Sequence, residues 1–315
     1  MKFGFEKVEF EGREGYKLFC DNDSFLIVVP VLGANVFRYI RKGTVIVDYS
    51  KGTLDAGGHT GCPMLYPTPN RVKNCRTIYR GKEYVQMKDG KEHILHGYVY
   101  DAPFAVEDVS ADETCAKIVM SYEMKKGDEV LKSYPFENKL TITVSLFESS
   151  MDISYVAENK SDAPMPYGFA IHPYFYFKDD AVFTIPSDRF VKTTPQVIPT
   201  REFPETEGTF PGINKGIKVS SVVLDNNFIK RDGDENATLT LLEEKLKIEL
   251  IADDIFKHFV VYTPYGANFI CIENQTCAID ANNLHNEGFV DEAALLILEP
   301  GEKGSGKITF AVSDI

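Results

Sequence analysis

Four side chains suited to acid–base or hydrogen-bonding chemistry lie in short segments rich in glycine, proline and aromatic residues. They are Arg71, His96, His172 and Glu273. A histidine and a desolvated glutamate can have pKa values near neutral pH, so together they could remove a proton at one atom and deliver one at another. Arginine adds several hydrogen-bond donors. Because the four residues are far apart in the chain, we expect the fold to bring them together at one site.

Two of the histidines have local sequences that favour a functional role. His96 precedes Gly97, which allows close approach of another backbone segment. His172 precedes Pro173, which disfavours helical backbone at the residue before it and predicts an extended conformation there. Either histidine could instead be a structural residue bonded to a neighbour. His93 and His96 form an HxxH pattern, but on a strand this spacing places the rings on opposite faces and no third ligand is evident, so a metal site is not favoured.

Two glutamates follow apolar runs that are typical of buried strands. Glu273 comes after residues 269–272, and Glu299 comes after residues 295–298. Burial at the end of a strand would raise the pKa of either carboxyl above its reference of about 4.3 and make the carboxylate a better base. Either could also be a bonded structural residue. Spacing in the sequence does not separate the two.

The elements that position these side chains are predicted to be strands. Residues 139–146 alternate between apolar and polar side chains, and residues 151–155 repeat this alternation after a polar turn at 148–150. This predicts an antiparallel hairpin with one face on a core. Similar strand patterns occur at residues 24–31, 245–250, 258–263, 268–272 and 307–312.

No long segment holds the 3.6-residue period of an amphipathic helix, so the chain is predicted to be all-β, a large antiparallel β-sandwich. Residues 187–218 contain several proline, threonine and glycine residues. We expect them to form a long irregular connection over one end of the sheets, where loops often cover a site.

Composition excludes several classes of protein. With 315 residues and 43% hydrophobic content, the chain can bury a large core as one β domain or two smaller ones. The formal net charge of −13 and the absence of a basic run disfavour nucleic acid as a partner. Six cysteines without CxxC spacing indicate reduced thiols rather than a zinc ribbon or a disulfide framework. Neither a signal peptide nor a membrane span is evident, which predicts a cytoplasmic protein without a membrane partner.

Short motifs along nearly the whole chain resemble, in order and spacing, those of the aldose 1-epimerase (mutarotase) family. They are Gly57, Gly58 and Gly61, then Asn70-Arg71, Leu95-His96-Gly97, His172-Pro173-Tyr174-Phe175 and Glu273-Asn274-Gln275-Thr276. The segment 298–302 resembles the closing L-x-P-G-E turn, which is structural in that family. The resemblance therefore favours Glu273 over Glu299 as the base.

The resemblance implies a single domain over residues 1–315, a galactose mutarotase-like supersandwich that binds a monosaccharide without a metal or an organic cofactor. The implied reaction is interconversion of the α and β anomers of a free hexose. Glu273 would be the general base on the C1 hydroxyl and His172 the general acid on the ring oxygen. His96 would lie near the ring oxygen, and Asn70, Arg71 and Asp225 would bind sugar hydroxyls.

Several departures from the family pattern keep alternatives open. Asn274 stands where the family usually has proline, and the chain has no tryptophan, so an aromatic platform under the sugar must come from residues such as Tyr174 or Phe175. No arginine cluster suited to phosphate is evident, which favours a free sugar over a hexose 6-phosphate. A glycoside hydrolase or polysaccharide lyase would need paired carboxylates or a basic groove. A non-catalytic sugar-binding protein would keep the same residues, and the identity of the sugar and the oligomeric state stay open.

Overall fold

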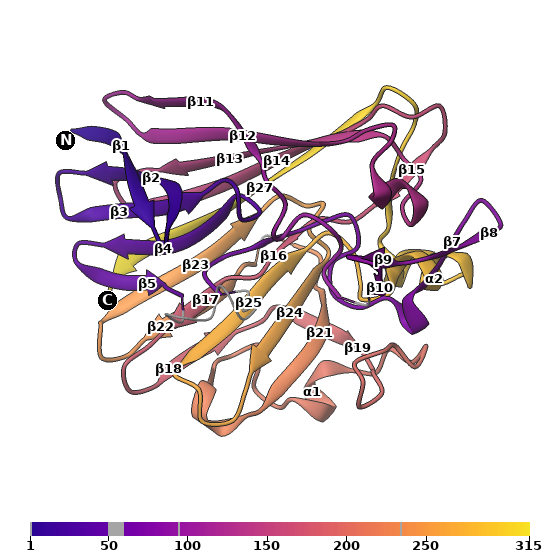
Figure 1. Cartoon of the computed structure of the whole chain (residues 1–315). Coiled ribbons are helices and arrows are strands. Elements are labelled where there is room, and N and C mark those ends of the chain that lie inside the picture. Colours follow the sequence, from indigo (N-terminus) through magenta and orange to yellow (C-terminus); the bar gives the residue numbers. More distant parts are fainter. Residues whose placement is uncertain (1, 50–59, 94, 234) are drawn as a thin grey trace.

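The computed structural model describes residues 2–49, 60–93, 95–233 and 235–315, and strands dominate the described chain (Figure 1). Within these ranges the larger sheet has twelve strands, each antiparallel to its neighbours. Ten of them follow one another in space as β1 (Phe3–Phe10), β2 (Arg13–Cys20), β3 (Ser24–Val29), β4 (Asn35–Arg41), β5 (Thr44–Val47), β17 (Tyr174–Tyr176), β25 (Phe269–Gln275), β24 (His258–Thr263), β21 (Leu224–Lys230) and β19 (Ser187–Val191). The short strand β16 (Ala170–Ile171) pairs with β25 and with β6 (Met64–Leu65).

The smaller sheet has nine strands in the described part of the chain, and it packs against the larger one. Its spatial order is β11 (Ala105–Ala111), β12 (Ala116–Met124), β13 (Asn138–Leu146), β14 (Ser150–Asn159), β27 (Lys303–Asp314), β23 (Leu246–Ala252), β22 (Ala237–Leu241), β18 (Ala181–Thr184) and β20 (Ile217–Lys218). Three two-stranded ribbons accompany the sheets: β7 (Arg76–Tyr79) with β8 (Lys82–Val85), β9 (Met87–Lys88) with β10 (Lys91–Glu92), and β15 (Met165–Tyr167) with β26 (Leu296–Leu298).

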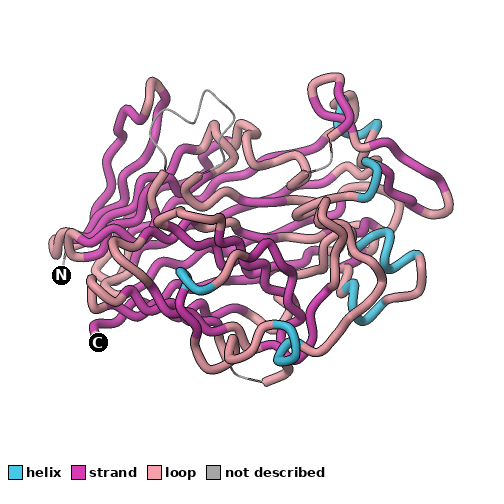
Figure 2. Tube along the Cα trace, turned by 90° about the horizontal axis from the view of Figure 1, so that it is seen from below, coloured by secondary structure: helices cyan, strands magenta, loops and turns pink. Residues whose placement is uncertain are grey.

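Helices are short and peripheral, as Figure 2 shows. They are α1 (Thr206–Thr209), α2 (Ala281–Asn286) and α3 (Val290–Ala293), with the 3-10 turns η1 (Lys73–Cys75), η2 (Glu129–Lys132) and η3 (Val219–Ser221). None of the helices in the described ranges is long and apolar enough to cross a membrane.

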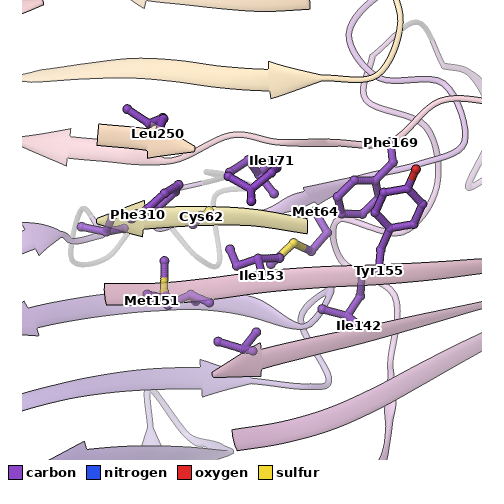
Figure 3. Packing of buried hydrophobic residues seen from close by; sticks show 14 of the residues in the cluster. Cys62, Met64, Ile142, Met151, Ile153, Tyr155, Phe169, Ile171, Leu250 and Phe310 are labelled. Atoms are coloured by element: carbon purple, nitrogen blue, oxygen red, sulfur yellow. The ribbon is translucent and has the colours of Figure 1, made fainter. Parts of the chain in front are cut away.

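The core lies between the two sheets, and alternation along the strands builds it. In β13 every second residue is buried, so one face of the strand packs inward while the threonines face outward. Ile142 and Ile153 from the smaller sheet lie near Met64 from the larger one (Figure 3). The rings of Tyr155 and Phe169 stack with centroids 4.1 Å apart. One face of the larger sheet is therefore committed to the core, and its opposite face is left for other contacts.

Most of the predicted elements are confirmed. The chain is an all-β antiparallel sandwich; residues 258–263 form β24 with the predicted bounds, and β13 and β14 form the predicted hairpin. The strand predicted at 24–31 ends at Val29, because Pro30 follows. Assignment of residues 1–315 to one domain stays a prediction.

The prediction of one irregular connection over residues 187–218 is wrong in part. The segment begins with the edge strand β19 and contains α1 and β20. β19 pairs with β21, almost forty residues later in the chain, with a shift in register. Strand pairing of this kind depends on a distant partner, which local proline, threonine and glycine content does not reveal.

Candidate functional site

Strand β25 places Glu273 on the face of the larger sheet that points away from the core. Ile270 and Ile272 of this strand belong to the core, so the alternating residues Cys271 and Glu273 face the other way. Glu273 pairs across the sheet with Val260 of β24, and it is only 1% exposed. A buried carboxylate near the middle of a sheet is costly unless neighbouring groups compensate for its charge.

His172 meets Glu273 from the adjacent segment between β16 and β17. Its Nε2 atom lies 3.1 Å from Glu273 Oε1. The backbone N–H of His172 donates to the carbonyl oxygen of Pro63 at 3.0 Å, which ties this segment to the chain just before β6. The imidazole ring stacks on Tyr174 with centroids 4.9 Å apart and an interplanar angle of 14°. Neighbours on two sides therefore set the orientation of the ring.

His96 completes a cluster of two histidines and one glutamate. Its ring lies perpendicular to that of His172, with centroids 5.4 Å apart. The backbone N–H of His96 donates to the carbonyl oxygen of Asn70 at 2.7 Å. Gly97 has a positive φ of 68°, and a Cβ atom there would lie 2.3 Å from the carbonyl oxygen of Tyr66. The predicted need for glycine beside His96 is thus confirmed as a close approach of two backbone segments.

Arg71 and Asp225 lie together at a more exposed position, from a loop and from β21 respectively. Arg71 Nη1 is 3.7 Å from Asp225 Oδ2 and donates to Asn70 Oδ1 at 3.3 Å. Burial raises the pKa of Asp225, and the nearby Arg71 cation opposes that effect. Asn70, Arg71 and Asp225 together present hydrogen-bond donors and hydrogen-bond acceptors, which suits the binding of hydroxyl groups.

Asp280, which sequence reasoning did not single out, holds the loop that carries Arg71. Its backbone N–H donates to the carbonyl oxygen of Arg71 at 3.0 Å, and its Oδ1 accepts from the backbone N–H of Lys73 at 3.0 Å. Arg201 Nη2 lies 3.6 Å from the other carboxylate oxygen. Burial raises the pKa of Asp280 to about 6, with these donors opposing the shift. No local motif points to this residue, because Arg71 and Lys73 lie some two hundred residues earlier in the chain.

Burial also shifts the pKa of Glu273 well above its usual range. A hydrogen bond from Gln275 Nε2 to Glu273 Oε2, 2.8 Å long, works against the shift, and the Asp225 carboxylate adds to it. Gln275 is a second residue to which sequence reasoning gave no role. Its position two residues after Glu273 on a strand puts both on one face, and this period of two was the available signal.

Other candidates from the sequence lie outside this cluster or outside the described ranges. Glu299 is exposed, in a turn where its backbone N–H donates to the Glu302 carboxylate at 2.8 Å. Phe175 is buried in the core, so only Tyr174 of the two proposed platform residues faces the site. Gly57 and Gly58 lie outside the described residues.

The HxxH pattern also has a local explanation. His93 Nε2 lies 2.8 Å from the carbonyl oxygen of Gly97, so this ring holds the turn next to His96. In the ranges that the structure describes, no group of three or more His, Cys, Asp or Glu side chains is arranged to hold a metal ion.

The sandwich of two large antiparallel sheets is the fold of galactose mutarotase-like proteins. A galactose mutarotase-like protein from Clostridium acetobutylicum superposes with a TM-score of 0.89 at 19% identity, covering 99% of each chain. A putative aldose 1-epimerase from Escherichia coli K12 gives 0.78 at 18% identity, covering 99% of this chain and all of that one. These similarities establish the fold.

The family model of aldose 1-epimerase matches residues 17–311, and the chain belongs to this family. The structure of galactose 1-epimerase from Lactobacillus acidophilus NCFM superposes with a TM-score of 0.77 at 17% identity, with 99% of each chain covered. The chain is also 22% identical over 285 residues to the uncharacterised protein YihR of Escherichia coli K12. The matched region covers 87% of this chain and 86% of that protein.

Proposed function

We propose that this protein is an aldose 1-epimerase that interconverts the α and β anomers of a free hexose. The observation that carries the proposal is the separation of 3.1 Å between His172 Nε2 and Glu273 Oε1. The C1 hydroxyl oxygen and the ring oxygen of a sugar are both bonded to C1, so a base for one and an acid for the other must be close neighbours. A base and an acid held this close suit that pair of oxygens.

In the proposed reaction Glu273, as a carboxylate, takes the proton of the C1 hydroxyl, while His172 gives a proton to the ring oxygen. The bond between C1 and the ring oxygen breaks, and a free aldehyde forms. Rotation about C1–C2 presents its other face. His172 then recovers its proton as the former ring oxygen attacks C1, and Glu273 returns a proton to the aldehyde oxygen. Protons balance over the cycle, and no covalent intermediate with the protein is needed.

The other residues have binding roles in this proposal. His96 lies beside His172 and would bind near the ring oxygen, while Asn70, Arg71 and Asp225 would bind hydroxyls. Arg71 is within 3.7 Å of the Asp225 carboxylate. A phosphate placed there would meet a negative charge, and this supports a free sugar over a hexose 6-phosphate. In this proposal the protein is cytoplasmic and its partner is a small-molecule monosaccharide.

Polarimetry tests the proposal. Freshly dissolved α-D-glucose and α-D-galactose should relax to their usual final rotation faster with the protein than without it, in a buffer that is a weak catalyst of mutarotation. The same assay with glucose 6-phosphate separates the phosphosugar alternative, which predicts faster relaxation of that compound alone. Binding of sugar by calorimetry with no acceleration for any of the three would contradict catalysis and indicate a binding protein.

A further inference from the structure

Gln275 lies on the same face of β25 as Glu273, two residues further along the strand. It is 0% exposed, and its backbone pairs with β16 on one side and with β24 on the other. The next residue is fixed as well: the backbone N–H of Thr276 donates to the carbonyl oxygen of Phe169 at 2.9 Å, and Thr276 Oγ1 accepts from the N–H of Phe169 at 2.9 Å. A sugar cannot reach so buried a side chain, so any role of Gln275 in catalysis must act through a neighbour.

The Glu273 carboxylate is held at both of its oxygen atoms, by a different group at each. Gln275 Nε2 donates to Glu273 Oε2 at 2.8 Å, and Glu273 Oε1 lies 3.1 Å from His172 Nε2. Rotation of the carboxylate about its terminal bond would break both contacts. Because the amide binds Oε2, Oε1 is the oxygen that faces the proposed acid and that would accept the proton of the C1 hydroxyl.

The other end of the Gln275 amide has no such contact. Among the residues that the structure describes, Gln275 Oε1 is buried without a hydrogen-bond partner. A buried amide that is satisfied at one end only costs folding free energy, which an apolar side chain of the same length would not cost. Packing therefore does not explain a glutamine at this position, whereas its hydrogen bond to Glu273 does.

The ionisable groups around this hydrogen bond come from several elements. Those that face the Glu273 carboxyl group or its partner His172 are His172 itself, His96, Arg71, Asp225, Tyr174, Cys62 and Cys271. Burial raises the pKa of the phenol and of both thiols, so these three groups are uncharged near neutral pH. His258, which pairs with Gln275 across the sheet, is also uncharged there, because burial lowers its pKa to about 3. Burial raises the pKa of Glu273, and the Gln275 hydrogen bond opposes this effect more strongly than the Arg71 cation does.

We propose that Gln275 is the positioning residue of the general base: its amide N–H holds the Glu273 carboxylate with Oε1 toward His172 and favours the ionised form that accepts a proton. This inference rests on the proposed epimerase function and assigns a further residue to it. A donor to a carboxylate stabilises the charged form more than the neutral form, because the interaction with a full negative charge is stronger. Loss of the donor should therefore leave Glu273 protonated up to a higher pH, without changing how the sugar is bound.

Gln275→Met tests this proposal, since methionine has a similar length and no N–H donor in its side chain. Polarimetry with α-D-galactose over a range of pH would give kcat and KM for the variant and for the unmodified protein. We expect the pH at which kcat/KM reaches half of its maximum to rise by roughly one unit, and KM at high pH to stay within about twofold. Gln86→Met is the matched control, because Gln86 is only 2% exposed but its Nε2 donates to the carbonyl oxygen of Ser133 at 3.3 Å. It should leave the half-maximal pH unchanged.

Gln275→Glu covers the case in which the methionine variant fails to fold. It keeps the size of the side chain and places a second carboxyl group beside Glu273 Oε2, and two carboxyl groups this close cannot both ionise readily, so the half-maximal pH should rise at least as far. Carbon NMR of the Glu273 carboxyl group, identified by the loss of its signal in Glu273→Gln, should show the same rise and needs no turnover.

Two results would overturn the role of Gln275 and leave the epimerase function intact. One is a half-maximal pH and an NMR titration that do not change in the Gln275 variants. The other is a loss of kcat/KM that is equal at every pH, which would indicate a structural role only. No acceleration of any sugar by the unmodified protein would instead overturn the epimerase function, and with it the base that Gln275 is proposed to position.

Discussion

Two pairs of ionisable side chains lie on the same face of the larger sheet and differ in burial and in the elements that carry them. The side chains of His172 and Glu273 are 10% and 2% exposed, come from central strands or the segment between them, and lie 3.1 Å apart. Those of Arg71 and Asp225 are 26% and 35% exposed and lie 3.7 Å apart. Burial strengthens electrostatic interactions and shifts pKa values, which suits proton transfer, whereas an exposed pair can exchange water for sugar hydroxyls at low cost.

This difference teaches that the buried centre of the larger sheet holds the proposed chemistry, whereas the proposed recognition lies at a more exposed position shared by a loop, which carries Arg71, and β21, which carries Asp225. Groups on strands keep their geometry, as proton transfer requires. Loops vary more readily between relatives, and a loop-borne arginine can be re-aimed without disturbing the core. The predictions that follow test whether the two pairs separate into effects on kcat and effects on KM.

The largest effect is expected for Glu273→Gln. Removing the general base should lower kcat by roughly 10²- to 10⁴-fold, while the amide keeps the shape of the side chain and sugar binding stays near normal. Polarimetry measures the rate and calorimetry measures binding. Glu299→Gln is the control, because that glutamate is exposed in a turn; a large loss there with the fold intact would show that the wrong glutamate was chosen.

The local backbone at His172 and the buried strand that carries Glu273 could be predicted from the sequence alone. Pro173 indicated extended backbone at His172, and the apolar run before Glu273 indicated a buried strand. Composition and period did not show that these two residues meet, because β17 and β25 are almost a hundred residues apart and their pairing depends on the whole sheet. The resemblance to a family supplied that pairing.

The contacts that hold Arg71 near Asp225 were harder to predict. Asp280 holds the Arg71 loop through backbone hydrogen bonds, and such contacts leave no mark in a local sequence pattern. Gln275 could have been found from its period-two spacing with Glu273. The order of strands in each sheet could not be predicted from the sequence either, since alternation identifies strands and their faces but not their partners.

His172→Asn should have the next largest effect. Asparagine can donate a hydrogen bond but cannot supply a proton to the ring oxygen, so kcat should fall by roughly 10²-fold with little change in KM. Progress curves at several sugar concentrations measure both quantities. Near-normal kcat in this variant would mean that another group protonates the ring oxygen.

Arg71→Ala should instead raise KM. The loss of a charged donor to hydroxyls should raise KM by about tenfold and leave kcat within a few-fold, because the proposed proton transfers do not use the guanidinium. Arg76→Ala is the matched control, since Arg76 follows in the same segment and pairs at the surface with Glu92 at 2.8 Å. A fall in kcat as large as that of Glu273→Gln would remove the proposed division between the two pairs.

A smaller rise in KM, roughly threefold, is expected for Asp280→Ala, because the Arg71 loop loses a hydrogen bond to Lys73 N–H. Asp280→Asn keeps an acceptor and should restore most of the affinity. Glu287→Gln is the control: in the described part of the chain the Glu287 carboxylate accepts its hydrogen bonds from Arg201 rather than from the Arg71 loop. If Asp280→Ala and Asp280→Asn raised KM equally, the lost hydrogen bond to the loop would not be the cause of the rise in KM.

The smallest effect concerns stability. A folded-state pKa above the unfolded value means that a buried Glu273 costs stability as pH rises through the folded pKa. Glu273→Gln should therefore match the parent at about pH 4 and exceed its Tm by roughly 1–3 °C at about pH 8. Thermal unfolding followed by circular dichroism measures both, and an identical difference at the two pH values would contradict a buried, ionisable Glu273.

The most direct test of the central claim, that Glu273 is a buried general base, is the pH dependence of kcat/KM for α-D-galactose. This quantity reports ionisations of the free protein, after subtraction of the buffer rate. Because the base acts as a carboxylate and burial raises its pKa, kcat/KM should rise with pH through a range clearly above that of an ordinary glutamate. A rate that is already maximal at pH values where an ordinary glutamate has just ionised, or that does not vary with pH, would contradict the account.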